Sequence, residues 1–253
     1  MKTLVMLLLL IISSTNLFAG TRDPHTPDEK YIEYGSKFEY ILNLCGVYED
    51  NSMFCGSAVA INKNWILTAA HVVKNAKHCG IHIKDYEVIL IDKIIPHQDF
   101  NGEFGIADIA LCKLKTQLNL DFYPSLYENN DEINKLCCMA GYGLTGTFNT
   151  GQIISDNRRR AGSNFIDKIH KDLLICSPSK NHLDKKTALE FIICSGDSGG
   201  GLFIDGKLAG INSCVITDKK NGAPDSKYGT ESGHTRVSKF LSWILENLKN
   251  NDK

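Results

Sequence analysis

The stretch CSGDSGGGLF, residues 194–203, places two serine hydroxyls and one carboxylate in a run of glycines. A serine hydroxyl becomes a useful nucleophile only when a nearby base takes its proton and a third group orients that base. Glycines let the backbone N–H groups around a nucleophile face developing negative charge. The stretch therefore predicts a nucleophile at Ser198 if the chain also supplies a base and a buried acid. Without them it is a glycine-rich turn.

His71 is the best candidate for the base among the eight histidines. It follows the hydrophobic stretch WILTAA, whose two alanines leave room for other segments to approach the imidazole. Taken alone, the pattern is explained better by a half-buried histidine that closes a strand. The assignment of His71 therefore depends on finding its acid partner.

Asp108 is the candidate for the orienting acid because it lies in the apolar run IADIAL. A buried carboxylate without a partner is costly, so such a residue is expected to have one. Asp92 and Asp99 are alternatives, but their polar neighbours indicate solvent-exposed side chains. A buried carboxylate can hold one imidazole nitrogen and stabilise the imidazolium that forms during proton transfer.

The motifs LTAAH, DIAL and GDSGG, in this order, resemble the three catalytic motifs of the chymotrypsin-like (trypsin-like) serine proteases. Subtilisin-like enzymes and α/β-hydrolases carry the same residue types in other orders. The resemblance extends from about residue 35 to 248 and implies hydrolysis of a protein or peptide substrate through an acyl-enzyme. It makes His71, Asp108 and Ser198 the catalytic triad. A non-catalytic binding protein with the same fold and an esterase remain as alternatives.

The resemblance also assigns roles to the residues around Ser198. The backbone N–H groups of Gly196 and Ser198 would form the oxyanion hole, and Asp197 would make a buried ion pair that holds the loop. The family's usual activation sequence, a basic residue followed by IVGG, is absent, and KYIEYG stands at the comparable distance. Either cleavage after Lys30 frees an amine on Tyr31, or an internal cation pairs with Asp197. We favour the second because Tyr31 is bulky for a buried terminus.

Substrate preference is predicted from residues that the resemblance places around the side chain preceding the cleaved bond. Family members that cut after Arg or Lys carry an aspartate six residues before the nucleophile, where this chain has Ile192. The other expected pocket residues are Ser195, Ser213, Val215, Ser232 and His234. No acid is among them, so we expect no preference for Arg or Lys. A preference for Arg or Lys would require Asp218 or Asp225 to fold back into the pocket. His234 is either a structural histidine or a pocket group that favours acidic substrate side chains.

The elements that must position these residues are mostly β-strands. Short apolar or alternating runs recur between turns rich in Gly, Asn, Asp and Lys, which is typical of a barrel or sandwich. The resemblance implies an all-β fold of two packed six-stranded antiparallel barrels, with His71 and Asp108 on the first and Ser198 on the second. We expect barrels at about 35–115 and 135–236, an irregular link between them, and an amphipathic C-terminal helix at about 237–249. Arg158, Arg159 and Arg160 are expected in a solvated loop.

Composition and the N-terminus limit the function further. A chain of 253 residues with 43% hydrophobic content can bury a large core, and its net charge of −1 implies no general attraction to nucleic acid or anionic membranes. Residues 1–19 read as a signal peptide with cleavage after Ala19, because their apolar run is too short to span a bilayer. We therefore expect a secreted or periplasmic peptidase domain at 20–253, with no membrane span after processing.

Export permits disulfides, and the chain has nine cysteines, an odd number. No CxxC pair or paired-histidine spacing occurs among them, so neither a metal nor another cofactor is predicted. By the resemblance, Val72 stands where the family usually has a cysteine, so the family's usual disulfide to Cys55 cannot form. Cys79 is the candidate replacement.

Overall fold

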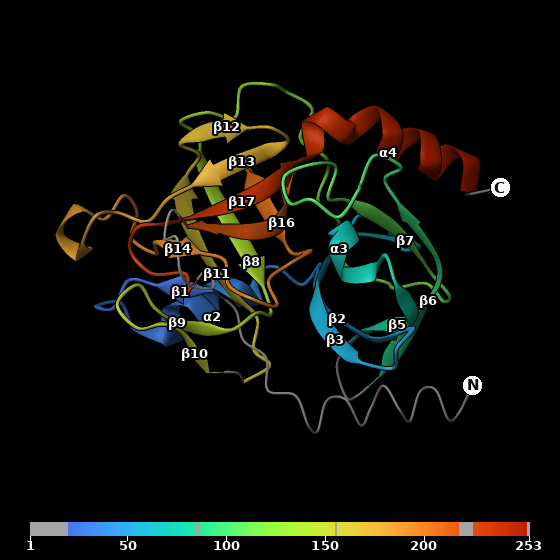
Figure 1. Cartoon of the computed structure of the whole chain (residues 1–253), viewed down its shortest axis with the longest axis horizontal. Helices are drawn as coiled ribbons and strands as arrows, with labels where there is room; N and C mark the ends of the chain where they lie inside the picture. Colours follow the sequence, from blue (N-terminus) through green and yellow to red (C-terminus); the bar gives the residue numbers. More distant parts are fainter. Residues whose placement is uncertain (1–19, 84–86, 155, 218–224, 252–253) are drawn as a thin grey trace.

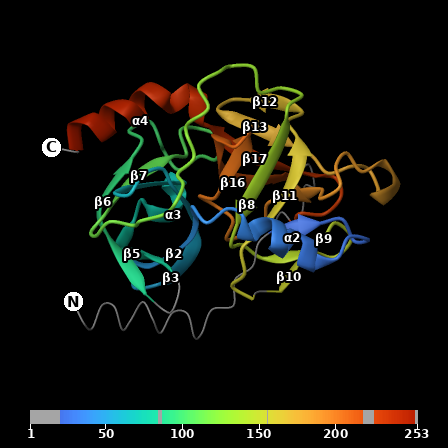
Figure 2. The same cartoon turned by 180° about the vertical axis from the view of Figure 1, so that it is seen from behind.

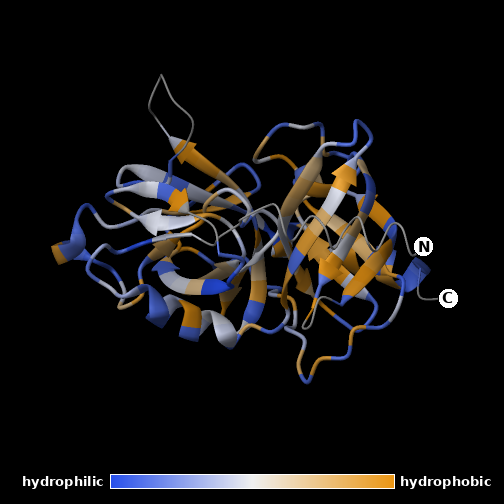
Figure 3. Ribbon diagram, turned by 90° about the horizontal axis from the view of Figure 1, so that it is seen from below, coloured by the Kyte–Doolittle hydropathy of each residue, from blue (hydrophilic) through white to orange (hydrophobic). Residues whose placement is uncertain are grey.

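The computed structural model describes residues 20–83, 87–154, 156–217 and 225–251. Two groups of strands lie side by side, and the C-terminal helix runs over one end of them (Figures 1 and 2). Figure 3 shows that hydrophobic residues concentrate on the strands, whereas the connecting loops are mostly hydrophilic. This distribution is the expected one for sheets that bury one face against a core.

The first group of strands forms a closed barrel in the order β2-β3-β4-β7-β6-β5. All neighbouring strands are antiparallel. The strands are β2 (Ile41–Tyr48), β3 (Met53–Ala60), β4 (Trp65–Thr68), β5 (Ala76–His82), β6 (Val88–Pro96) and β7 (Ala110–Leu114). The six-stranded first barrel is confirmed, and it lies within the expected residues.

The second group is a seven-stranded antiparallel sheet in the order β11-β8-β15-β16-β17-β13-β12. Its strands are β8 (Leu136–Gly141), β11 (Arg160–Phe165), β12 (Lys168–His170), β13 (Leu173–Cys176), β15 (Gly201–Ile204), β16 (Lys207–Thr217) and β17 (Thr230–Arg236). The count exceeds the predicted six because β12 forms a short hairpin with β13 at the sheet edge. Only three residues long and largely exposed, β12 carries no clear hydrophobic pattern.

A smaller sheet of four strands carries the N-terminus of the described chain. Its order is β10-β9-β1-β14. The strands are β1 (Thr21–Arg22), β9 (Thr145–Thr147), β10 (Gly151–Ile154) and β14 (Phe191–Ile192). Because β1 lies between β9 and β14, the first residues after the predicted signal peptide are built into the second unit.

Helix α4 (Val237–Asn251) confirms the predicted C-terminal helix. Val237, Phe240 and Ile244 are buried and belong to the same hydrophobic core as the strands of the first barrel. The helix therefore ties the end of the second unit to the first. None of the helices in the described ranges is long and apolar enough to cross a membrane. The other helical segments are α2 (Asp28–Ser36), α3 (Ala70–Val73) and the 3-10 turn η2 (His182–Asp184).

The predicted solvated position of the arginine cluster is wrong for two of its three members. Arg160 is 1% exposed and pairs with Asp28 at 2.6 Å and Asp156 at 2.8 Å. Arg159 donates to the Ile41 carbonyl at 2.9 Å and contacts the end of α2. The reason is that α2, which was not predicted, carries Asp28 in its first turn to this loop. The two arginines therefore hold α2 in place.

The candidate disulfide between Cys55 and Cys79 is also wrong. Cys55 is bonded to Cys45, and Cys79 is a buried free cysteine. Cys45 on β2 lies directly opposite Cys55 on β3 in the antiparallel register. Such cross-strand neighbours bring their Cβ atoms close, and this decides the pairing.

Candidate active site

His71 and Asp108 form a close pair on the first barrel. His71 lies in α3, directly after β4, and its Nδ1 is 2.7 Å from Asp108 Oδ2. The His71 backbone N–H donates to the other carboxylate oxygen at 2.9 Å. Asp108 is fully buried, whereas the His71 side chain is 25% exposed. An ionised carboxylate only accepts hydrogen bonds, so Nδ1 carries the proton and Nε2 is left as the accepting nitrogen.

Asp108 is held by residues from the second unit. The Ser213 hydroxyl donates to Asp108 Oδ2 at 2.6 Å, and the Thr235 hydroxyl donates to the Asp108 carbonyl at 3.0 Å. Ser213 was predicted to line the pocket for the substrate side chain. In the structure its hydroxyl donates a hydrogen bond to the Asp108 carboxylate. These bonds place His71 and Asp108 against β16 and β17.

The turn before Asp108 depends on Asp172, a residue that the sequence did not single out. Ala107 adopts a positive φ of 46°, which is unfavourable for a residue with a side chain. Its N–H donates to Asp172 Oδ2 at 2.9 Å, and the same carboxylate pairs with Lys239. Asp172 stands beside a lysine at the start of a strand, where the sequence indicates only a turn residue.

The nucleophile loop between β14 and β15 lies against the strands that lead to His71. The Ser198 carbonyl accepts from the Ser57 N–H on β3 at 2.8 Å. At Gly199, a Cβ would lie 2.1 Å from the Ser57 carbonyl oxygen and from Thr68 Oγ1, so no side chain fits there. Across the described residues, no hydrogen bond joins Ser198 to His71. Catalytic hydrogen bonds often tighten only when substrate binds.

Two backbone donors in this loop have no acceptor. Gly196 adopts a φ of 89°, and its carbonyl accepts from the Ser57 hydroxyl at 3.0 Å. Within the described ranges, neither the Gly196 N–H nor the Ser198 N–H makes a hydrogen bond. Both residues are partly exposed, so their N–H groups are accessible to solvent or to an anionic ligand atom.

Asp197 is fully buried and accepts hydrogen bonds from three backbone N–H groups. Gly143 donates to Oδ1 at 2.8 Å, and Cys194 and Gly20 donate to Oδ2, each at 2.8 Å. Burial raises the pKa of the Asp197 carboxyl from 3.8 to about 7, although the three N–H groups act against this rise. The Gly20 nitrogen is therefore in direct contact with a buried carboxylate whose ionised form is disfavoured by burial.

Of the two predicted partners of Asp197, Tyr31 lies elsewhere, whereas an internal cation, Arg160, acts on the carboxylate through its charge. Tyr31 is fully buried inside α2, and its hydroxyl donates to the Glu190 carbonyl at 3.1 Å. The three hydrogen bonds described above for the Asp197 carboxylate come from backbone N–H groups, and the positive charge of Arg160 lowers its pKa. Strand β1 pairs with β14 in register and brings the preceding residue, Gly20, to the carboxylate.

His234, a predicted pocket residue, is an internal structural histidine. It is fully buried, with Nδ1 2.8 Å from Asn212 Oδ1 and Nε2 3.0 Å from the Ser232 hydroxyl. Burial lowers the pKa of His234 to about 3, so the ring is neutral at physiological pH. His234 therefore offers no positive charge to an acidic substrate.

The remaining predicted pocket residues lie on four segments. Ile192 is buried on β14, where it pairs with Thr21, and Ser195 is exposed in the nucleophile loop. Val215 and Ser232 face each other across β16 and β17. Two aspartates were considered as possible counter-ions in the pocket, and one of them, Asp225, pairs with Lys227 at 3.0 Å. The other, Asp218, lies outside the described residues.

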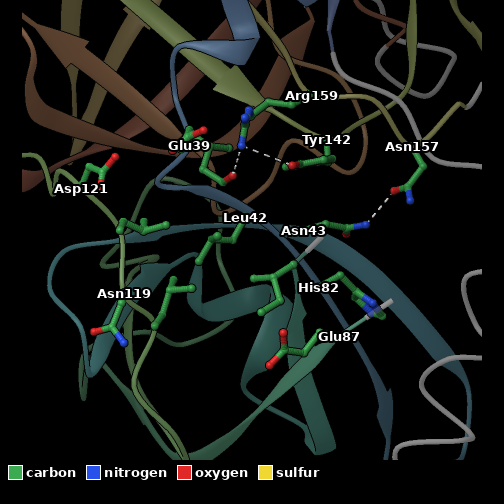
Figure 4. A pocket seen from close by; sticks show the side chains of 14 residues that line it. Glu39, Leu42, Asn43, His82, Glu87, Asn119, Asp121, Tyr142, Asn157 and Arg159 are labelled. Atoms are coloured by element: carbon green, nitrogen blue, oxygen red, sulfur yellow. Dashed lines mark hydrogen bonds between the residues drawn. The ribbon is translucent and has the colours of Figure 1, made fainter. Parts of the chain in front are cut away.

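A cleft of about 660 Å³ is found elsewhere, where the first barrel meets the segment 118–121 and the loop that holds Arg159 (Figure 4). Its lining includes none of the triad residues. Arg159 donates to the Tyr142 hydroxyl on one wall at 3.4 Å, and His82 and Glu87 lie on the opposite side. The cleft is therefore distinct from the His71–Asp108 site.

Comparisons with known proteins agree with this geometry. The sequence model of the family described as Trypsin matches residues 42–244. The chain is 28% identical to "Serine protease SSP1" of Scolopendra subspinipes over 99% of this chain and 96% of that protein. It is 30% identical to "Granzyme B(G,H)" of Mus musculus over 77% of this chain and 80% of that protein.

The fold is likewise similar to solved structures. A structure titled as HL collagenase matches with a TM-score of 0.65 and 23% identity, covering 85% of this chain and 95% of that one. Neuropsin of mouse brain, whose title calls it a serine protease, matches with the same TM-score and 20% identity, covering 85% of this chain and 96% of that one. At this identity the likeness concerns the fold, and it extends over both β units.

Proposed function

Because the chain belongs to the trypsin family of serine proteases, we propose that it is an exported endopeptidase that cuts proteins through His71, Asp108 and Ser198. The observation that carries the proposal is the 2.7 Å contact between His71 and the buried Asp108. The unpaired N–H groups of Gly196 and Ser198 add a site for the oxyanion. A non-catalytic binding protein would have no need for this combination.

The arrangement supports acyl transfer in two steps. Ser198 Oγ attacks the peptide carbonyl while His71 Nε2 takes its proton, and Asp108 stabilises the imidazolium that results. The carbonyl oxygen becomes an oxyanion that accepts from the Gly196 and Ser198 N–H groups. His71 then protonates the leaving amine, and water repeats the sequence on the acyl-enzyme. The activity is tested by incubating the chain that begins at Gly20 with an unfolded protein. Cleavage that a fluorophosphonate blocks is expected, and neither cleavage nor labelling would contradict the proposal.

Removal of residues 1–19 would place a cation in direct contact with Asp197. Cleavage after Ala19 gives Gly20 a terminal amine, and the Gly20 nitrogen already lies 2.8 Å from Asp197 Oδ2. The ammonium and the carboxylate would then form a buried ion pair that fixes the loop carrying Gly196 and Ser198. The exported domain, residues 20–253, is thus active as soon as its signal peptide is removed.

The pH dependence of folding should differ between the processed and unprocessed chains. In a chain that retains Ala19, the pKa of Asp197 is about 7 in the folded state, well above the 3.8 of an unperturbed carboxyl. The folded state therefore binds the Asp197 proton more tightly than the unfolded state does. The stabilisation of the fold by this protonated carboxyl is fully present below about pH 4 and is lost as the pH rises to about 7. In the processed chain, the Gly20 ammonium favours the ionised carboxylate, and this loss should vanish.

Urea unfolding of both chains between about pH 4 and pH 8 measures this difference. We expect the free energy of unfolding of the processed chain to exceed that of the chain retaining Ala19 by an amount that grows with pH. Parallel pH profiles for the two chains would contradict the proposed ion pair.

The preferred side chain before the cleaved bond is proposed to be uncharged. With Ile192 buried in place of an acid, a bound Arg or Lys would find no counter-ion among the described residues predicted to line the pocket. A desolvated, unpaired cation should reduce kcat/KM at least about 100-fold relative to an uncharged side chain. A panel of peptides that differ only at this position tests the prediction. Faster cleavage after Arg or Lys would overturn it.

A further inference from the structure

Two free cysteines of the second unit touch each other in its interior. The sulfur atoms of Cys137 and Cys176 lie 3.7 Å apart, and the two residues are 39 positions apart in the chain. Their exposed fractions are 1% and 0%. Cys137 also donates to the Asn164 carbonyl at 3.3 Å. Neither residue is near enough to solvent to act as an exposed thiol.

The two cysteines come from strands that are not neighbours. In the seven-stranded sheet, β8 carries Cys137 and β13 carries Cys176, and β15, β16 and β17 lie between them. Contact between the two sulfurs therefore crosses the interior of the curled sheet. Both belong to one buried hydrophobic cluster with Leu174 and Leu202. Unlike the first barrel, this sheet is not closed by backbone hydrogen bonds between its edge strands.

We propose that Cys137 and Cys176 form a disulfide in the exported protein, which staples β8 to β13 across the second unit. The step breaks two S–H bonds and makes one S–S bond, releasing two protons and two electrons. The electrons pass to the disulfide of a thiol–disulfide oxidant, which is reduced to two thiols. Bond formation requires the sulfurs to approach from 3.7 Å to about 2.05 Å. The proposal rests on export to an oxidising compartment and not on the proteolytic activity.

The bond would brace strands on two sides of the active site. Cys176 pairs in register with Ser232 on β17, and the Ser232 hydroxyl lies 3.3 Å from the Cys176 carbonyl. On the other side, β8 ends at Gly141, two residues before the Gly143 N–H that binds Asp197. The disulfide would thus fix both a predicted pocket strand and the support of the nucleophile loop.

Peptide mapping of the exported protein tests the bond directly. The protein is denatured with an alkylating agent, without reductant, and digested with trypsin, which cuts after Lys and Arg. We expect a linked pair of peptides, residues 136–158 and 172–180, that separates on reduction. The first peptide also contains Cys138, so the same experiment on Cys138→Ala should still give the linked pair. Alkylation of both Cys137 and Cys176 in the unreduced protein would overturn the proposal.

Thermal unfolding provides a second, independent readout. In the variant Cys45→Ala/Cys55→Ala, which lacks the disulfide of the first barrel, reductant should lower Tm by about 5–10 °C. Adding Cys137→Ala should abolish this effect of reductant, whereas adding Cys138→Ala, a neighbour on the same strand, should retain it. A Tm that does not respond to reductant in the Cys45→Ala/Cys55→Ala variant would contradict the proposed bond.

Discussion

A chain that retains Ala19 before Gly20 is expected to cleave peptides at least about 100-fold more slowly than the chain that begins at Gly20, as for loss of one oxyanion donor. In the retained form, the Gly20 nitrogen is a neutral amide, so it gives the buried Asp197 no charged hydrogen-bond donor. The loop that presents the Gly196 and Ser198 N–H groups then loses its ion pair. The measurement is kcat/KM for both chains on one peptide substrate. Equal activity would contradict the role of the terminal amine.

The fit of Gly20 itself can be tested with a matched pair of glycine variants. Gly20 has a φ of 60°, and a Cβ there would lie 1.8 Å from an atom of the Phe191 ring. Gly206 has a similar φ of 75°, but a Cβ there would meet nothing within 4 Å. In chains processed at the same bond, Gly20→Ala should lose most activity, whereas Gly206→Ala, with comparable backbone strain, should keep it. Equal loss in both would assign the effect to strain alone.

Ser198→Ala is expected to lower kcat/KM by roughly 10⁴-fold or more, the cost of removing a triad nucleophile. The change deletes one hydroxyl that makes no hydrogen bond in the described chain, so Tm should stay within about 2 °C of the unchanged protein. Ser125→Ala is the control, since Ser125 is an exposed serine outside the site. The control should cleave at a near-normal rate. Undiminished cleavage by Ser198→Ala would remove the assignment of the nucleophile.

Much of the site could be predicted because its chemistry constrains short stretches of sequence. A buried acid between apolar residues implies a partner, and the structure pairs Asp108 with His71 at 2.7 Å. The glycines around Ser198 are required by positive φ angles and close approach, as at Gly199. Helix α4 could be predicted because its apolar residues recur at helical spacing over several turns.

The partner of Asp197 could not be found in the same way. Strand β1 has only two residues, too few for any hydrophobic period, and it is defined by pairing with β14 far along the chain. Its sequence carries no sign that Gly20 will meet a carboxylate 177 positions away. The same limit applies to Ser213, whose bond to Asp108 joins two units.

The arginine cluster illustrates a different limit. A dense run of like charge is usually solvated, but Arg160 is buried because Asp28 and Asp156 neutralise it. That outcome depends on α2, whose position against β11 is set by tertiary packing and not by the cluster itself. A run of charged residues thus predicts solvent-exposed side chains only when no oppositely charged residue from another segment packs against it.

The most direct measurement of the central claim is the site of covalent labelling by a fluorophosphonate. The chain that begins at Gly20 is treated with the reagent, and the adduct is located by mass spectrometry of its peptides. The account predicts one adduct per chain, on Ser198, which forms when the folded protein is treated and does not form when the protein is denatured before treatment or carries His71→Ala. An adduct on another serine, or rapid peptide cleavage by a chain that takes up no label, would contradict it.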